Sequence, residues 1–259
     1  MLESLYSGSL ADAERRRENV SLAQIEKLAL SAADAKDAVS LLRMGPNLRV
    51  IAEIKRASPS KGKLAEIPDP AALGFTYESS GAAAISVLTE ERLFLGSLQD
   101  FDDVRERVSL PLLRKDFIAN EYQVLEARAH GADIVLLIVA GLKADLLIRL
   151  KDFIESLGMT AFIETHSRDE VDFAADINAA LVGVNSRDLT TFETDRSLFA
   201  SLVDRLPKNA VKVAESAVRG LDDASAYAGA GADCVLVGEA LVKGDPAELI
   251  HAFSQIPKA

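Results

Sequence analysis

The feature that most constrains the fold is a regular alternation of short apolar runs with segments of helical periodicity. Runs rich in Val, Ile and Leu begin at residues 48, 83, 111, 133, 159, 180, 210 and 233, so that successive starts lie 21 to 35 residues apart. This spacing accommodates a strand, a loop, a helix and a second loop. Runs this uniformly apolar indicate strands buried on both faces, as in a parallel sheet. Eight such units predict an α/β fold closed into a (βα)8 TIM barrel.

The rival arrangement of alternating strands and helices is a doubly wound open sheet. No GxGxxG loop follows the first run, which lowers this alternative only modestly. The segment there, RASPSKGK, also lacks the GxxxxGK[ST] spacing, and we interpret it as a flexible, lid-like loop whose Ser58 and Lys61 can reach a ligand. The run GADIVLLIV resembles GADCVLVG four units later, as a duplicated half-barrel would leave.

Residues before the first run form a segment of their own. Apolar positions at helical spacing in VSLAQIEKLALSAADAKDAVSLLRMG predict helix, and Gly45-Pro46 is a stop signal. We therefore expect an N-terminal helical extension over residues 1–46 and a barrel over residues 47–259, together forming one structural domain. Helix starts in the barrel are marked by Asp69-Pro70, Asn120 and Asp245-Pro246, and helix ends by Gly131 and Gly231.

Charge and hydropathy limit the possible partners. The formal net charge of −11 disfavours nucleic acid, because an acidic chain is repelled by phosphate backbones. The N-terminal residues are polar and charged, unlike a signal peptide, and the longest apolar run, residues 134–142, is too short to span a membrane. We expect a cytoplasmic, monomeric protein that acts on a small molecule and has no membrane partner.

Polar residues end several of the predicted strands, where barrel enzymes place their functional groups. Because side chains of one parity point inward, the polar residues that follow inward apolar ones should meet at the barrel mouth. A single Glu–Lys pair there could be a structural ion pair that plugs the barrel, but groups from five strands predict a catalytic mouth. These residues are Glu53 and Lys55, Lys115, Glu164, Asn185 with Arg187, and Glu215 with Ser216.

These residue types suit acid–base chemistry on an anionic substrate. Lys55, Lys115 and Arg187 would supply a local positive field that the acidic chain lacks overall. A buried lysine near other cations is poised to give up a proton and suits a general acid. A glutamate in a dry pocket suits a general base.

A phosphate site is predicted after the seventh and eighth strands. Barrels often bind phosphate there, with the N-terminus of a short extra helix. The seventh strand runs into ESAVRG and the eighth into VGEALVKGDP, in which EALVKG forms one helical turn. The histidines at 130, 166 and 251 lack metal-ligand spacing, so we expect no metal site and assign them structural or solvated positions.

The chain resembles the indole-3-glycerol phosphate synthase family over nearly its whole length. The resemblance rests on IAEIKRASPSKG, GAAAISVLTEERLFLGSL, LPLLRKDFI, EYQVLEARAHGAD, GVNSRDLTTFETD, VAES and VLVGEALV. It implies a carboxy-lyase that converts 1-(2-carboxyphenylamino)-1-deoxyribulose 5-phosphate to indole-3-glycerol phosphate, carbon dioxide and water. It also implies a (βα)8 barrel whose extra N-terminal segment borders the active site, with no metal or organic cofactor.

The resemblance further implies a role for each matching residue. Lys115 would be the general acid that protonates the substrate ketone, and Glu164 the general base in the later dehydration. Lys55 would bind substrate and share proton transfer with Lys115, while Glu53 orients both lysines. The remaining residues expected at the site are Asn185, Arg187, Ser58 and Phe117 against the substrate, Glu215 at the mouth, and Ser216, Ala217, Gly238 and Glu239 near the phosphate.

Two positions depart from the family pattern. Ala217 stands where the family usually has Gly, and Ala240 where it often has Ser. Backbone N–H groups survive both changes, so we expect weaker substrate binding at most. The alternatives are another phosphate-binding barrel, such as a ketose–aldose isomerase, and a non-catalytic binding module. A lysine on the third strand with a glutamate on the fifth favours the synthase, and the intact charges argue against the module.

Overall fold

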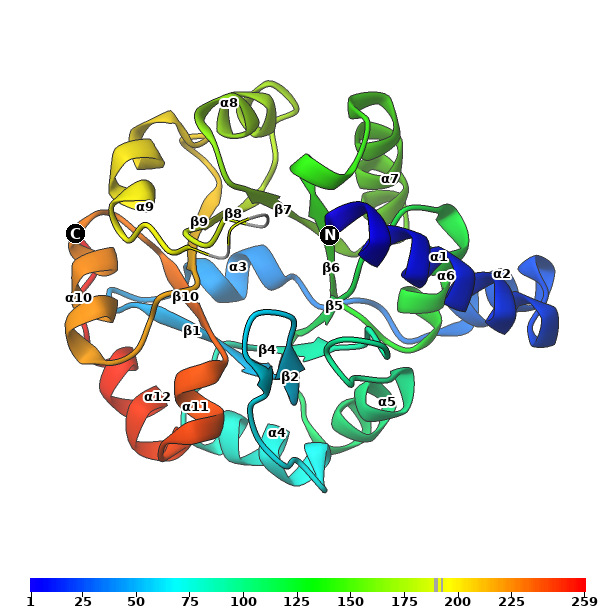
Figure 1. Ribbon diagram of the computed structural model, residues 1–259, viewed down its shortest axis with the longest axis horizontal. Coiled ribbons are helices and arrows are strands. Elements are labelled where there is room, and N and C mark those ends of the chain that lie inside the picture. Colours follow the sequence, from blue (N-terminus) through cyan, green and yellow to red (C-terminus); the bar gives the residue numbers. More distant parts are fainter. Residues whose placement is uncertain (189–190, 192) are drawn as a thin grey trace.

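The predicted barrel is present in the computed structural model, which describes residues 1–188, 191 and 193–259. Within these residues, eight parallel strands close in the order β1-β10-β9-β8-β7-β6-β5-β4 (Figure 1). Each predicted run contains one strand, so the TIM barrel is confirmed and the open sheet is wrong. The strands are β1 (Arg49–Ile54), β4 (Ala84–Leu88), β5 (Leu112–Lys115), β6 (Ile134–Ile138), β7 (Thr160–Thr165), β8 (Leu181–Asn185), β9 (Val211–Glu215) and β10 (Cys234–Val237).

Helices form a ring outside the strands (Figure 1). Several begin where the sequence predicts, because Asp69, Asn120 and Asp245 each accept a hydrogen bond from a backbone N–H of the first turn. The helices are α4 (Pro70–Ser79), α5 (Leu98–Arg107), α6 (Glu121–Ala129), α7 (Ala144–Ser156), α8 (Arg168–Asp176), α9 (Ser197–Leu202), α10 (Leu221–Gly229), α11 (Glu239–Lys243) and α12 (Pro246–Ser254), with 3-10 turns η1 (Val139–Gly141) and η2 (Val203–Arg205). Of the helices in the described part of the chain, none is long and apolar enough to cross a bilayer.

The barrel interior explains where the polar side chains go. Its lower part is filled by fully buried apolar residues that include Ile51, Leu113 and Phe162. Two residues further along the same strands, the inward positions are Glu53, Lys115 and Glu164. Because the interior below them is closed, these side chains have only the carboxyl end of the barrel to occupy.

The N-terminal extension is helical, as predicted, but it is broken into α1 (Leu2–Asn19), α2 (Leu22–Ser31) and α3 (Ala38–Arg43). Ser21 starts α2 through a capping box with Gln24, and Asp37 caps α3, so these polar residues divide the segment. Helix α1 lies near the ends of β5 and β6, and α2 lies beside α6 (Figure 1). Helix α3 packs against the opposite end, where Cys234 Sγ contacts the Leu42 carbonyl at 3.6 Å.

The loop after β1 contains regular structure that the sequence did not reveal. A short antiparallel hairpin, β2 (Ala57–Ser58) and β3 (Gly62–Lys63), lies over the barrel in the view of Figure 1. Its turn carries Ser60, which accepts a hydrogen bond from Arg187 of the loop after β8, and Lys61, which donates to Glu239 of α11. These contacts connect the hairpin to the loop after β8 and to α11.

Candidate active site

A cavity of about 930 Å³ opens at the carboxyl end of the barrel. This volume lies in the range of pockets that bury small ligands. Every site residue predicted from the sequence lines it: Glu53, Lys55, Ser58, Lys115, Phe117, Glu164, Asn185, Arg187, Glu215, Ser216, Ala217, Gly238 and Glu239. The side chains that strand parity places at the mouth therefore lie around one cavity, although parity could not give their pairing.

Lys115 lies at the centre of the polar part of the cavity. Its Nζ lies 2.8 Å from Oε2 of Glu164 and 2.8 Å from Oε2 of Glu215, and it donates to both. Both carboxylates are almost fully buried, and the Lys115 side chain is 14% exposed. Beside this cluster, Lys55 pairs with Glu53. The mouth thus contains two ion-paired groups, each with its lysine facing the cavity.

The surroundings of Lys115 correct one expectation. We expected neighbouring cations to make this lysine give up its proton readily, and that prediction is wrong. Burial alone would lower the pKa of Lys115, but the adjacent carboxylates of Glu164 and Glu215 outweigh burial and raise the pKa above its ordinary value. Lys115 is therefore charged at neutral pH.

The two glutamates beside Lys115 differ in protonation. Burial favours the neutral form of Glu164, but Lys115 and His166 outweigh it and hold the pKa of Glu164 well below its usual value. Burial and the negative charge of Glu164 raise the pKa of Glu215 to about 8, against the opposing effect of Lys115. An ionised and a largely protonated carboxyl group therefore share one ammonium near neutral pH.

Two glycines make room for these carboxylates. A Cβ on Gly183 in β8 would lie 2.1 Å from Oε1 of Glu215, and a Cβ on Gly238 would lie 2.3 Å from Oε2 of Glu53. Real Cβ contacts are not this short. Gly183 in β8 and Gly238, directly after β10, thus leave space for the acidic side chains inside the barrel.

Asn185 connects the acid–base cluster to the loops above it. Its Nδ2 donates to Oε1 of Glu164 at 3.1 Å, while its Oδ1 accepts from Ser216 Oγ at 2.8 Å. The same oxygen accepts from the backbone N–H of Arg187 at 3.1 Å. Arg187 in turn donates to Ser60 Oγ at 2.8 Å and so ties the β2–β3 hairpin to the loop after β8.

The predicted phosphate end lies between β9 and α11. Ser216 and Ala217 both adopt left-handed backbone conformations, with φ of 65° and 59°. The Glu239 carboxylate pairs with Lys61 at 2.7 Å and Lys243 at 2.9 Å. Burial would raise its pKa, but these lysines outweigh burial and lower the pKa to about 2.

Several cations at this end were missed from the sequence. Arg196, Arg219 and Lys243 also line the cavity, next to the predicted phosphate residues. They lie beyond the strand ends, in the loops after β8 and β9 and in α11, where strand parity says nothing about direction. A signal was available in their sequence position, because loops following the last strands of a barrel border its mouth.

The opposite end of the cavity is aromatic and apolar. Phe117 packs edge-on against Tyr6 with ring centroids 5.5 Å apart, and Phe94 lies 6.1 Å from Phe117. Leu2 and Leu5 of α1 also line this part of the cavity. Only Phe117 was predicted, because the others come from the extension and from the loop after β4.

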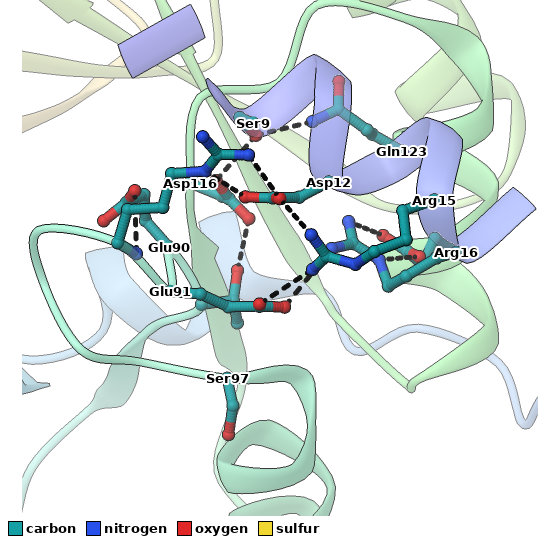
Figure 2. Close-up of polar contacts among 12 residues, drawn as sticks. Ser9, Asp12, Arg15, Arg16, Glu90, Glu91, Ser97, Asp116 and Gln123 are labelled. Atoms are coloured by element: carbon teal, nitrogen blue, oxygen red, sulfur yellow. Dashed lines mark hydrogen bonds and ion pairs between the residues drawn. The ribbon is translucent and has the colours of Figure 1, made fainter. Parts of the chain in front are cut away.

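Helix α1 is fixed to the mouth by polar contacts around Asp116 (Figure 2). The Asp116 carboxylate accepts from Ser9 Oγ at 3.0 Å, from Thr89 Oγ1 at 2.7 Å and from the backbone N–H of Phe117 at 2.8 Å. Gln123 donates to Ser9 Oγ at 2.8 Å. The helix that covers the aromatic end is therefore bonded to the residue that directly follows Lys115.

Ion pairs extend this attachment along α1, as Figure 2 shows for its labelled residues. Arg16 donates to Glu126 of α6 at 2.6 Å and 2.9 Å, and Arg15 to Glu91 in the loop after β4 at 3.0 Å. Asp12, which is 7% exposed, accepts from Arg92 of the same loop. The charged residues of α1 around Arg15 and Arg16 thus form part of an interface with α6 and the loop after β4.

One of the three histidines lies next to the acid–base cluster, a position that we did not predict. His166, which follows β7, lies 3.2 Å from Glu164 and is 11% exposed. Its position two residues after Glu164 is the signal that could have revealed it, because residues two apart share one face of a strand. Within the described ranges, no cluster of His, Cys, Asp and Glu could hold a metal ion.

Comparisons with known proteins give matches over nearly the whole chain. The sequence model of a family described as indole-3-glycerol phosphate synthase matches residues 2–253. A protein of that name from Leifsonia xyli subsp. xyli is 54% identical over 253 residues, which are 98% of this chain and 97% of that protein. Another of that name, from Mycolicibacterium gilvum, is 55% identical over 247 residues, 95% of this chain and 90% of that protein.

Among solved structures, 3-hexulose-6-phosphate synthase from Salmonella typhimurium is similar with a TM-score of 0.61. The match covers 81% of this chain and 98% of that chain at 14% sequence identity. At this identity the likeness shows the barrel fold alone.

Proposed function

Because the chain belongs to the indole-3-glycerol phosphate synthase family, we propose that Lys115 and Glu164 are the general acid and the general base of its reaction. The chain is a carboxy-lyase of tryptophan biosynthesis. Its substrate is a small phosphorylated molecule, 1-(2-carboxyphenylamino)-1-deoxyribulose 5-phosphate. The isomerase and the non-catalytic module are thereby set aside.

Lys115 supplies the proton for ring closure. As the new carbon–carbon bond forms, the ketone oxygen of the substrate becomes a hydroxyl and needs a proton, which the charged ammonium carries. Glu215 lies 2.8 Å from Nζ and has a pKa raised to about 8, so it can return a proton to Lys115. Decarboxylation then restores the ring electrons that closure displaced.

Glu164 removes a proton from the substrate in the final step, while the ammonium group of Lys55 or Lys115 donates a proton to the departing hydroxyl group, which leaves as water. A base must be ionised before it acts, and the low pKa of Glu164 satisfies this condition at neutral pH. Asn185 and Lys115 hold its two oxygens in place. Lys55 binds substrate and shares proton transfer with Lys115, while Glu53 orients the Lys55 ammonium through their ion pair.

The two ends of the cavity support one orientation of the substrate. The aromatic end around Phe117 suits the carboxyphenyl ring, and the cationic end suits the phosphate. Ser58 and Arg187 then lie beside the middle of the substrate. At the phosphate end, we assign backbone N–H groups of Ser216, Ala217, Gly238 and Glu239, because the Glu239 carboxylate itself would repel an anion.

The observation that carries this proposal is the 2.8 Å contact between Lys115 and Glu164 inside the cavity. The test is to follow indole formation by absorbance with wild type, Lys115→Ala and Glu164→Gln. We expect each substitution to reduce kcat by about 10²- to 10⁴-fold, with circular dichroism unchanged. The control is Lys27→Ala in α2, where the lysine is exposed and does not line the cavity. If both site variants keep near-normal kcat, the assigned roles are wrong.

A further inference from the structure

His166 lies behind Glu164 and bridges it to α8. Its Nε2 is 3.2 Å from Oε1 of Glu164, and its Nδ1 is 3.3 Å from Oε2 of Glu170. The backbone N–H of His166 also donates to Oε2 of Glu170, at 2.8 Å. The side chain is 11% exposed, and it is not among the described residues that line the cavity. His166 therefore contacts the proposed base from the side away from the substrate.

The position of His166 between two carboxylates favours a charged imidazole. A neutral ring has one N–H and one lone pair, so one nitrogen would turn its lone pair toward a carboxylate oxygen. Only the doubly protonated ring is attracted to both Glu164 and Glu170. Burial lowers the pKa of His166, but these two carboxylates outweigh burial and raise the pKa to about 10. The contact with Glu164 is an ion pair, since Nε2 makes no hydrogen bond to a described residue.

We propose that His166 is a positioning residue for Glu164. Glu170 holds the His166 imidazolium, which in turn holds Oε1 of the Glu164 carboxylate and keeps that carboxylate ionised, so that it can act as a base. The inference rests on the proposed function, because it assigns His166 a role only through Glu164. It extends the acid–base machinery to a residue that has no contact with the substrate.

Other charges also face Glu164, and they limit the size of the effect. Lys115 donates to its second oxygen, so one cation remains when His166 is removed. An opposite charge within about 4–6 Å typically lowers a carboxyl pKa by about 1–3 units. The groups around Glu164 and His166 from every packed element are Lys115 of β5, Asn185 of β8, Glu215 of β9, Tyr6 of α1 and Glu170 of α8.

The test is the pH dependence of kcat for His166→Asn and His166→Gln. Without the imidazolium, Glu164 becomes protonated at higher pH, so the acid limb of kcat should move upward by about 1–3 pH units. KM should change less than about twofold, because His166 does not line the cavity. A residue that only supported the fold would lower kcat at all pH values alike and would leave the limb in place.

Two further variants make the result decisive. His130→Gln is the matched control, because His130 pairs with Asp102 between α5 and α6 and lies outside the cavity lining. It should leave the profile unchanged. Glu170→Gln removes the carboxylate that holds His166 in place. It should move the acid limb of kcat upward as well, by a smaller amount than the His166 variants do. It also serves as the test if the His166 variants fail to fold.

The outcomes separate this inference from the proposed function. If Glu164→Gln is nearly inactive while His166→Asn or Glu170→Gln has the wild-type profile, the role of His166 is refuted and that of Glu164 stands. If Glu164→Gln keeps a near-normal rate, the proposed base is wrong and the role of His166 falls with it. If the acid limb of kcat moves upward in the His166 variants while the His130→Gln profile is unchanged, the roles of Glu164 and of His166 are both supported.

Discussion

Substituting Gly183 with alanine should damage both stability and turnover, because the new methyl group has no room. Its Cβ would lie 2.1 Å from Oε1 of Glu215 and 2.7 and 2.9 Å from ring atoms of Phe162. Phe162 is fully buried in the barrel interior and cannot move aside without disturbing the core. Glu215 would therefore have to retreat by more than 1 Å to reach an ordinary contact of 3.4 Å, and it is tied to Lys115.

The size of the effect follows from these contacts. Inserting a methyl group into a packed interior costs about 1–3 kcal/mol of the free energy of unfolding. The smaller unfolded-state entropy of alanine offsets about 0.5–1 kcal/mol of this. Displacing a catalytic group by about 1 Å can reduce kcat by roughly 100-fold. We expect Gly183→Ala to lose about 1–2 kcal/mol in stability and on the order of 100-fold in kcat.

The assay combines urea unfolding with steady-state indole formation. The matched control is Gly229→Ala at the end of α10, where an added Cβ meets nothing within 4 Å. This control should raise the free energy of unfolding by about 0.5–1 kcal/mol and leave kcat unchanged. If Gly183→Ala kept a wild-type or higher free energy of unfolding and a wild-type kcat, the idea that this glycine makes space for the Glu215 carboxylate would be refuted.

Ala217→Gly should raise the free energy of unfolding by about 0.5–1 kcal/mol in urea, because Ala217 has a left-handed φ of 59° that glycine adopts more readily. An unchanged or lower value would contradict strain at this position. Glu215→Gln should remove a pH-dependent part of stability: with a folded pKa raised to about 8, protonation of Glu215 stabilises the fold fully below about pH 4.5, and this contribution is lost as pH rises to 8. The wild type minus variant difference in unfolding free energy should fall from pH 5 to pH 8, and a constant difference would contradict the shift.

The sequence alone predicted the barrel and most of its polar mouth. Hydrophobic periodicity is a local property, so each apolar run identified its strand, and alternation placed Lys115 above Leu113 and Glu164 above Phe162. Helix starts were equally readable, because the Asp69 and Asn120 caps act within one turn. The family motifs then identified the reaction without any coordinates.

Other features depended on contacts between residues far apart in the chain. The hairpin at residues 57–63 is held by partners such as Arg187 and Glu239, and the aromatic end needs Tyr6 of α1 packed on Phe117. Strand alternation says nothing about where loop and extension side chains point.

The tertiary structure alone decided the charge states of the site. The sequence predicted which ionisable side chains meet, but not that Lys115 lies between two carboxylates or that His166 faces Glu164. A pKa depends on burial and on distances of a few ångströms to other charges, and neighbouring strands set those distances. The sequence therefore determined which side chains make up the active site, and the tertiary structure determined which of them are protonated.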